Sequence, residues 1–338
     1  MLPKENISEI QPQIIKQLLE KHYYSLVTTF YETQSVFLSG IYKRYGGIET
    51  ANIILCFARN MHLEIIRQRE RNLNYNVSLK NFWYNLNNVT KPLQKITTIV
   101  KTTGIPKETV RRKIKYLTSL GYLENMDSAQ GYCWSLSLNH KDTYLKIIDE
   151  EIKNLAKFTF KFSNYLNLNL SVQAVENEIK SQFSFYWYHF LSCQLQWLKI
   201  WQDKLKDNDL LLIALQTIIP ALQYGGKHNN KVNLDNIFKI IGKIEDRYSF
   251  SQTAVSATAV STITGIPRAT CIRKLNKLVA LGFVLREAKS KRYFINQNSN
   301  ERTKNILTKD NVDKTVEIFG KYLSIILTSL VHSRNNNI

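Results

Sequence analysis

Apolar residues recur at helical spacing in two related segments of this chain. Val110, Ile114 and Leu117 stand at positions i, i+4 and i+7, which places them on one face of a helix. The same spacing returns 161 residues later at Cys271, Leu275 and Leu278. Strand-like stretches are short and follow these segments. The pattern predicts a mostly α-helical chain built from two similar halves.

The two segments belong to an internal repeat. Residues 104–123 read GIPKETVRRKIKYLTSLGYL and residues 265–284 read GIPRATCIRKLNKLVALGFV, with nine of twenty positions identical and no gap. A fainter similarity joins NIILCFAR at 52–59 to DLLLIALQ at 209–216, with an offset of 157 residues. Two copies are too few for a solenoid, which needs about three. The sequence therefore predicts a duplicated domain.

Each half is expected to contain the same elements in the same order. An aromatic-rich helix (10–38 and 172–202) precedes an apolar helix (50–70 and 208–222) and an Asn-rich connection (72–91 and 224–235). Two helices around the GIP turn and a β-hairpin follow, at about 92–138 and 253–296. We expect the linker 141–154 to continue as a helix into the second half, and a helix at 310–332 to close the chain. These elements divide the chain into halves 1–150 and 151–338.

Glycine and proline mark the ends of the predicted helices. Gly104 and Gly265 each stand where a helix ends in a left-handed residue, a conformation that glycine adopts without a Cβ clash. Pro106 and Pro267 follow two residues later, at the expected first position of the next helix, where the missing N–H is harmless. Gly121 and Gly282 end that second helix, and a turn and a returning strand follow each of them. Helix, tight turn, basic helix and hairpin together predict a winged helix-turn-helix in each half.

The repeated segment also resembles a known class. The shared residues are Thr103-Gly104-Ile105-Pro106, Thr109, Arg112-Lys113 and Leu120-Gly121, with Thr264-Gly265-Ile266-Pro267, Thr270, Arg273-Lys274 and Leu281-Gly282 in the second copy. This pattern resembles winged-helix bacterial transcription regulators of the MarR and IclR kind, over about 40 residues of each half. The resemblance implies that the basic helix enters the major groove of DNA while the hairpin flanks the phosphate backbone.

Charge supports the same partner. The 338 residues carry 46 Lys and Arg against 27 Asp and Glu, for a formal net charge of +19. Residues 101–123 hold six cations and one Glu, and residues 265–292 hold eight cations and one Glu, which together account for +12 of that excess. A solvated helix face usually mixes both signs, whereas phosphate contact requires one sign. The charge therefore favours double-stranded DNA as the partner.

Position within each basic helix suggests roles. Residues at the start of a recognition helix reach base edges, and Arg binds guanine in a bidentate manner. Thr109 and Thr270 either contact phosphate or pack near the turn. Ile272 and Ala269 replace Arg111 and Glu108, so the two helices are expected to prefer different bases. The predicted DNA contacts are Lys107, Thr109, Arg111, Arg112, Lys115, Arg268, Thr270, Arg273, Lys274, Lys277, Lys289, Lys291 and Arg292.

Other classes find little support. The chain has 12 Gly and 6 Pro, few for the closely spaced turns of a sandwich, barrel or propeller. It contains no nucleotide-binding, hydrolase or zinc-protease motif, and we expect neither an enzyme nor a cofactor. Its four cysteines lack zinc-finger spacing and are expected to be free thiols. The aromatic segment Phe183–Trp201 either forms core or lines an effector pocket, and no effector is assigned.

The sequence thus predicts a sequence-specific, double-stranded DNA-binding protein, a transcription regulator with two tandem winged helices arranged as a pseudo-dimer within one chain. Further homodimerisation stays open. No apolar run reaches the roughly 20 residues that a membrane span requires, so a soluble, cytoplasmic protein associated with the nucleoid is expected. Two alternatives remain: a plasmid- or phage-type replication initiator with tandem winged helices, and a winged-helix scaffold that binds proteins instead of DNA.

Overall fold

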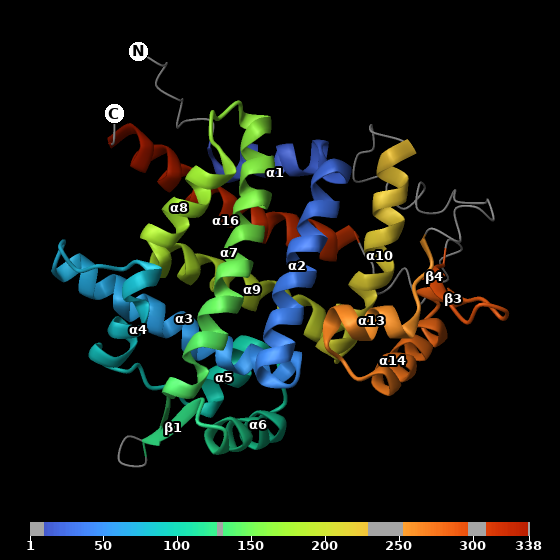
Figure 1. Ribbon diagram of the computed structural model, residues 1–338, viewed down its shortest axis with the longest axis horizontal. Coiled ribbons are helices and arrows are strands. Elements are labelled where there is room, and N and C mark those ends of the chain that lie inside the picture. Colours follow the sequence, from blue (N-terminus) through green and yellow to red (C-terminus); the bar gives the residue numbers. More distant parts are fainter. Residues whose placement is uncertain (1–9, 127–130, 229–252, 297–308, 337–338) are drawn as a thin grey trace.

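The computed structural model describes residues 10–126, 131–228, 253–296 and 309–336 (Figure 1). These residues are mostly helical, and their strands form two small antiparallel two-stranded sheets. The described elements of the first half are α1 (Pro12–Lys21), α2 (Tyr23–Tyr45), α3 (Ile48–Arg71), α4 (Leu79–Asn88), α5 (Ile96–Thr103), α6 (Lys107–Ser119), β1 (Leu123–Met126), β2 (Gly131–Trp134) and α7 (Lys141–Ser163).

The second half repeats this order. Its described elements are α8 (Val172–Ser181), α9 (Phe183–Leu205), α10 (Asn208–His228), α13 (Ala257–Thr264), α14 (Arg268–Ala280), β3 (Val284–Arg286), β4 (Tyr293–Ile295) and α16 (Lys309–Asn336). The starts of α8, α9 and α10 follow those of α1, α2 and α3 by 160 residues. The left-handed residues Gly46 and Lys206, which end α2 and α9, keep the same offset. The offset of 157 residues read from the sequence is therefore three residues too short for α3 and α10.

Three predicted boundaries are corrected. Each long aromatic helix is two helices, because His22 and Gln182 at equivalent positions leave the helical conformation. The break lets α1 and α8 turn away from α2 and α9 and pack against α16 and α7 respectively. The Asn-rich connection 72–91 contains α4, which Ser78 caps and which buries Phe82. Its counterpart at 224–235 continues α10 to His228 and then lies outside the described residues.

The linker between the halves forms a helix, as expected. Helix α7 continues past residue 150 and ends at Ser163. Asn167 takes a left-handed conformation, and Ser171 then caps α8 by accepting a hydrogen bond from the backbone N–H of Ala174. The repeated elements therefore restart at α8, and the boundary expected at residue 150 falls within α7.

The halves pack through each other instead of side by side. Helix α3 packs against α9 and α10 packs against α2, so the second long helix of each half contacts the first long helix of the other. Two ring contacts are equivalent in the two halves. The ring centres of Phe30 and Trp197 lie 6.0 Å apart and those of Phe190 and Phe37 lie 5.0 Å apart, both edge-to-face. One continuous hydrophobic core joins both halves. The aromatic helices thus meet in the core, as the sequence suggested.

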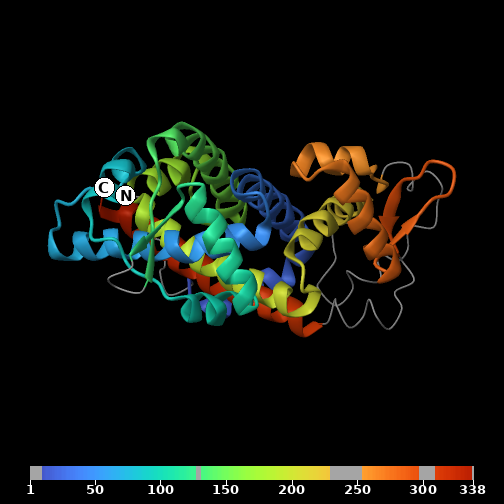
Figure 2. The same ribbon diagram turned by 90° about the horizontal axis from the view of Figure 1, so that it is seen from below.

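Both units around the GIP turns lie at the border of this body, and their buried residues belong to the same core. In Figure 1, α6 and α14 lie along the lower border of the molecule, and Figure 2 shows α13, α14 and the β3–β4 hairpin at one end of it. Helix α5 contacts α9 and α13 contacts α2, so each unit rests on the long helix of the opposite half. Both basic helices are therefore carried by one body.

Candidate nucleic-acid interface

The turn before each basic helix is built the same way in both copies. Thr103 Oγ1 donates to the carbonyl of Ile99 at 2.8 Å and accepts from the N–H of Ile105 at 3.2 Å. Gly104 follows with φ 71°, and Ile105 is fully buried. The second copy repeats the bonds through Thr264, at 2.7 and 3.2 Å. In each turn the Thr hydroxyl therefore bonds two backbone groups, the Gly adopts the left-handed conformation, and the Ile packs in the core.

The basic helices begin one residue later than the sequence suggested. Pro106 and Pro267 are the N-cap residues and lie outside the helix, with φ −56° and −53°. The predicted buried stripes are confirmed in both copies: Val110, Ile114 and Leu117 in α6, and Cys271, Leu275 and Leu278 in α14, are buried. Because these faces hold the helices on the body, the opposite faces point into solvent.

Most of the predicted contact residues lie on those outer faces. The side chains of Thr109 and Thr270, near the starts of the helices, are half-buried. Arg268 Nε donates to Thr258 Oγ1 at 3.1 Å, and Arg111 lies 3.3 Å from Glu108. The exposed cations of the two helices are Lys107, Arg111, Arg112, Lys115, Arg268, Arg273 and Lys277. Helix α14 carries no acidic residue.

Lys274 does not lie where the sequence placed it. Its side chain is buried, and its Nζ lies 2.6 and 2.8 Å from the two carboxylate oxygens of Asp207. Burial alone would raise the pKa of Asp207, but the hydrogen bond and charge of Lys274 outweigh it and lower that pKa. Lys277 also reaches Asp207, at 3.6 Å, but stays half exposed. Because Lys274 is buried and paired with Asp207, it is not free to bind a phosphate.

The helix spacing contained a signal for this position. Lys274 follows Cys271 by three residues and precedes Leu278 by four, so it stands on the buried stripe and not opposite it. Lys113 has the same place relative to Val110 and Leu117 and is half-buried. Of each Arg-Lys doublet, the arginine therefore faces solvent and the lysine faces the body.

The two hairpins differ in charge. In the second, the exposed side chains of Lys289, Lys291 and Arg292 gather at the tip, where Lys291 adopts a left-handed conformation with φ 55°. Backbone bonds from Lys291 to Glu287 and from Glu287 to Arg292 close this turn at 3.0 Å each. Sequence reasoning did not select Arg286, an exposed residue of β3 whose guanidinium lies 5.5 Å from the ring centre of Tyr293. The strand that bears the cationic tip thus adds a further cation.

The first hairpin is less basic in the part that the structure describes. Its exposed Glu124 pairs with Lys91 at 3.0 Å. Residues 127–130, which include the predicted acidic Asp127, lie outside the described residues. An additional bridge pairs Gln94 with Tyr132, and the equivalent bridge in the second copy pairs Val255 with Tyr293. A short third segment therefore extends both hairpins in the same way.

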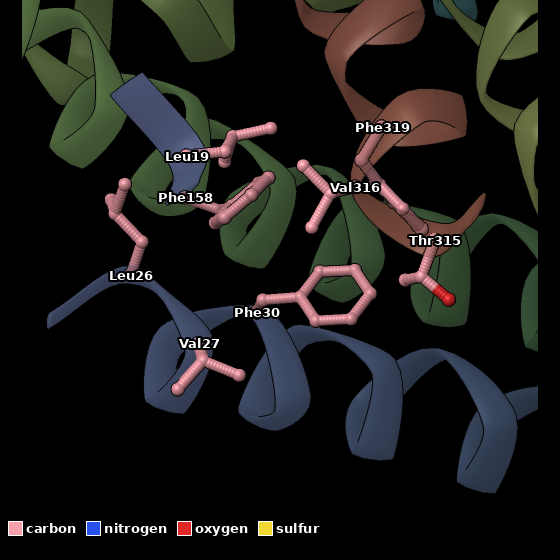
Figure 3. A pocket seen from close by; sticks show the side chains of 8 residues that line it. All are labelled: Leu19, Leu26, Val27, Phe30, Phe158, Thr315, Val316 and Phe319. Carbon is pink, nitrogen blue, oxygen red and sulfur yellow. The ribbon is translucent and has the colours of Figure 1, made fainter. Parts of the chain in front are cut away.

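Phe183, Trp187, Phe190 and Trp197 of the aromatic segment are buried in the core. A cavity lined in part by Trp197 and Trp201 of this segment has a volume of about 30 Å³. A second apolar cavity lies between α1, α2, α7 and α16, lined by Leu19, Leu26, Val27, Phe30, Phe158, Thr315, Val316 and Phe319 (Figure 3). Its volume of about 30 Å³ is far below the roughly 300–1,000 Å³ of small-molecule sites.

Cysteines, metal-binding groups and membrane-spanning helices are the remaining features to consider among the described residues. All four cysteines are buried and free. Among the described residues, no group of three or more His, Cys, Asp or Glu side chains is placed to bind a metal. None of the helices described combines the length and apolar character needed to cross a bilayer.

Comparison of the chain with models of known protein families, with curated protein sequences and with solved structures finds no significant match. The function of the chain is therefore inferred from its own geometry.

Proposed function

We propose that this protein binds double-stranded DNA in a sequence-specific manner through two tandem winged helices and acts as a transcription regulator. The observation that carries the proposal is the repetition of one exposed, basic helix at the same place in both halves. In each copy a tight turn precedes that helix and a two-stranded hairpin follows it. Helix α6 or α14 would enter the major groove, and the hairpin would contact the backbone.

The chemistry of the exposed residues supports contact with both bases and phosphates. Arg112 and Arg273 occupy equivalent exposed positions, and a guanidinium can bind the edge of guanine with two hydrogen bonds. Lys289, Lys291 and Arg292 at the tip of the second hairpin form a cationic surface suited to phosphate. The first hairpin, with Glu124 exposed, is less suited to that contact. The second copy is therefore proposed to bind the backbone more strongly.

The differences between α6 and α14 affect which DNA sequence the protein is proposed to recognise. Arg111 and Glu108 of α6 correspond to Ile272 and Ala269 of α14, so the two helices present different groups. A pseudo-dimer with two such helices is proposed to bind two non-identical half-sites. Recovery of a strict palindrome by selection from random duplexes would contradict this part of the proposal.

Charge reversal tests the proposal directly. The double variant Arg112→Glu and Arg273→Glu is expected to lower affinity for a selected duplex at least 100-fold, because each change replaces a favourable contact with repulsion of the DNA. Fluorescence anisotropy with a labelled duplex measures the affinity. Both positions are exposed, so the melting temperature is expected to stay within a few degrees of wild type.

The matched control carries the same charge change elsewhere. Lys314 and Lys321 are exposed on α16, which contacts α1, α7 and α9. The double variant Lys314→Glu and Lys321→Glu is expected to keep duplex affinity within about threefold of wild type. Equal loss in both double variants would show a response to net charge alone and would contradict a site on α6 and α14.

A further inference from the structure

The N-termini of α3 and α10 meet where the two halves join. The backbone N–H of Ile48, the first residue of α3, donates to Asp209 Oδ1 in the first turn of α10, at 2.8 Å. Glu49 and Asp209 are equivalent residues, one in each half, 160 residues apart. The N-terminus of α3 is therefore bonded to a first-turn carboxylate of α10, from the opposite half.

In the second half, this meeting point holds the basic helix α14. Lys274 Nζ lies 2.6 Å from Asp207 Oδ1 and 3.8 Å from Asp209 Oδ2. Asp207 Oδ1 also accepts the backbone N–H of Leu210 at 3.2 Å, which fixes the carboxylate at the start of α10. One lysine of the basic helix is thus held by two carboxylates whose own positions are set by helix starts.

The first half has a different arrangement for α6. Gly47 stands where Asp207 stands in the second half, and the structure places no ion pair on Lys113, the equivalent of Lys274, among the described residues. Helix α6 packs on α3 instead, and the N-terminus of α3 is bonded to Asp209 through Ile48. Asp209 therefore connects the helix that carries α6 with the lysine of α14.

We propose that Asp207 and Asp209 form a carboxylate junction that fixes α14 relative to α3, the helix on which α6 packs, through Lys274 and the N-terminus of α3. Lys274 is a positioning residue and does not touch the DNA. The inference rests on the proposed function, and it defines the DNA substrate further: two half-sites at one preferred separation. A protein with two independent binding units would tolerate many separations.

The first test compares duplexes that differ in the spacer between the half-sites. Wild type is expected to lose at least tenfold in affinity when two or three base pairs are added, because both helices can no longer reach their grooves. The variant Lys274→Met is expected to lose most of that spacer preference and to keep its affinity for a single half-site within threefold. Lys274→Arg, which preserves the pairing, is expected to restore the preference.

The salt dependence separates positioning from contact. Removal of a phosphate contact lowers the magnitude of the negative slope of log affinity against log salt by about 0.9. Lys274→Met is expected to leave the slope for a single half-site unchanged, whereas Lys289→Met in the cationic hairpin lowers it. A reduced slope in Lys274→Met, or a spacer preference equal to that of wild type, would overturn the inference. The double variant Lys274→Met and Asp207→Asn, which leaves no unpaired Asp207 carboxylate, serves if the single variant fails to fold.

A second readout needs no DNA and separates failure of the junction from failure of the proposed function. Ser119 and Ala280 are exposed, equivalent residues of α6 and of the C-terminus of α14. Spin labels at these positions are expected to give a narrow distance distribution in wild type and a broader one after Lys274→Met. The control Arg273→Met removes the same charge and is expected to stay narrow. Equal widths in all three proteins would refute the junction even if duplex binding is confirmed.

Discussion

At the scale of single residues, His62 shows how burial sets a protonation state. Its ring is fully buried, stacks on Phe82 at 4.9 Å and meets Phe183 edge-on at 5.2 Å. Neither ring nitrogen has a hydrogen-bond partner in the part of the chain that the structure describes. Burial lowers the pKa of His62 to about 3. The imidazole is therefore neutral in the fold throughout the physiological range.

This protonation state predicts a loss of stability in acid. The unfolded chain binds a proton at His62 below about pH 6.5, while the folded chain does not until about pH 3. His62 therefore has no pH-dependent effect on stability above pH 6.5. As the pH falls from 6.5 toward 3, it lowers the free energy of unfolding by up to about 1.4 kcal/mol per pH unit.

The variant His62→Leu, which introduces the residue found at the equivalent position Leu222, should show a shallower decline over that range. Urea unfolding at a series of pH values measures the difference between variant and wild type. Parallel stability curves for the two proteins would contradict a buried, neutral His62.

The residue scale also shows what the sequence could not assign. The exposed arginines Arg112 and Arg273 were placed correctly because the apolar stripe defines the opposite face of each helix. Lys274 was misplaced because helical spacing puts it on the edge of that stripe, where a lysine is buried only if a carboxylate is present to pair with it. Asp207 lies 67 residues away in the sequence, and no local pattern connects the two.

At the scale of elements, Gly121 and Gly265 share a conformational role at the end of a helix, and Gly265 also has a steric one. Gly265 adopts φ +76°, and a Cβ atom there would lie 2.9 Å from Lys43 Cγ of α2. Gly121, at the end of α6, has φ +72° but would meet nothing within 4 Å. The two positions share the backbone requirement and differ only in the approach of a neighbour.

Alanine substitution should separate the two roles. Gly121→Ala is expected to destabilise by about 1–2 kcal/mol, the ordinary penalty of a left-handed residue with a Cβ. Gly265→Ala is expected to cost more, because Lys43 must also shift at the contact between α13 and α2. Urea unfolding of the two variants measures both losses. A smaller loss for Gly265→Ala would contradict close docking of this turn on the opposite half.

Element boundaries were predictable where local chemistry determines them. The T-G-I-P sequence determines the turns, and the two helix ends that flank each turn were placed within a residue. The breaks at His22 and Gln182 were not predicted, since neither residue is a helix breaker and the cause is tertiary: the flanking helices pack on different partners. Helix α4 was missed because its exposed asparagines resemble a loop while Phe82, Trp83 and Leu86 form a short buried face.

At the scale of the whole molecule, the two halves form one interlocked body. Each half supplies helices that pack on the other, and each unit around a GIP turn rests on the opposite long helix. The repeat in the sequence predicted the duplication. It could not predict that α7 contacts α8 and that α16 contacts α1 of the opposite half, because an apolar face indicates burial without indicating the partner.

The interlocked body sets where much of the excess charge lies. Two equivalent basic helices pack on one body, and Asp207 and Asp209 connect α14 with the N-terminus of α3. A duplex held by both helices and the second hairpin would contact many cations of one protein molecule. The affinity should therefore depend steeply on salt, as phosphate contacts release condensed counterions.

The most direct test of DNA binding is the affinity of the purified chain for a selected duplex at several salt concentrations. Six to ten phosphate contacts predict a straight line of log affinity against log salt with a slope of about −5 to −9. The variant Arg112→Glu and Arg273→Glu should not bind within the same range. A flat salt dependence, or unchanged binding by that variant, would contradict the account and favour a protein-binding scaffold.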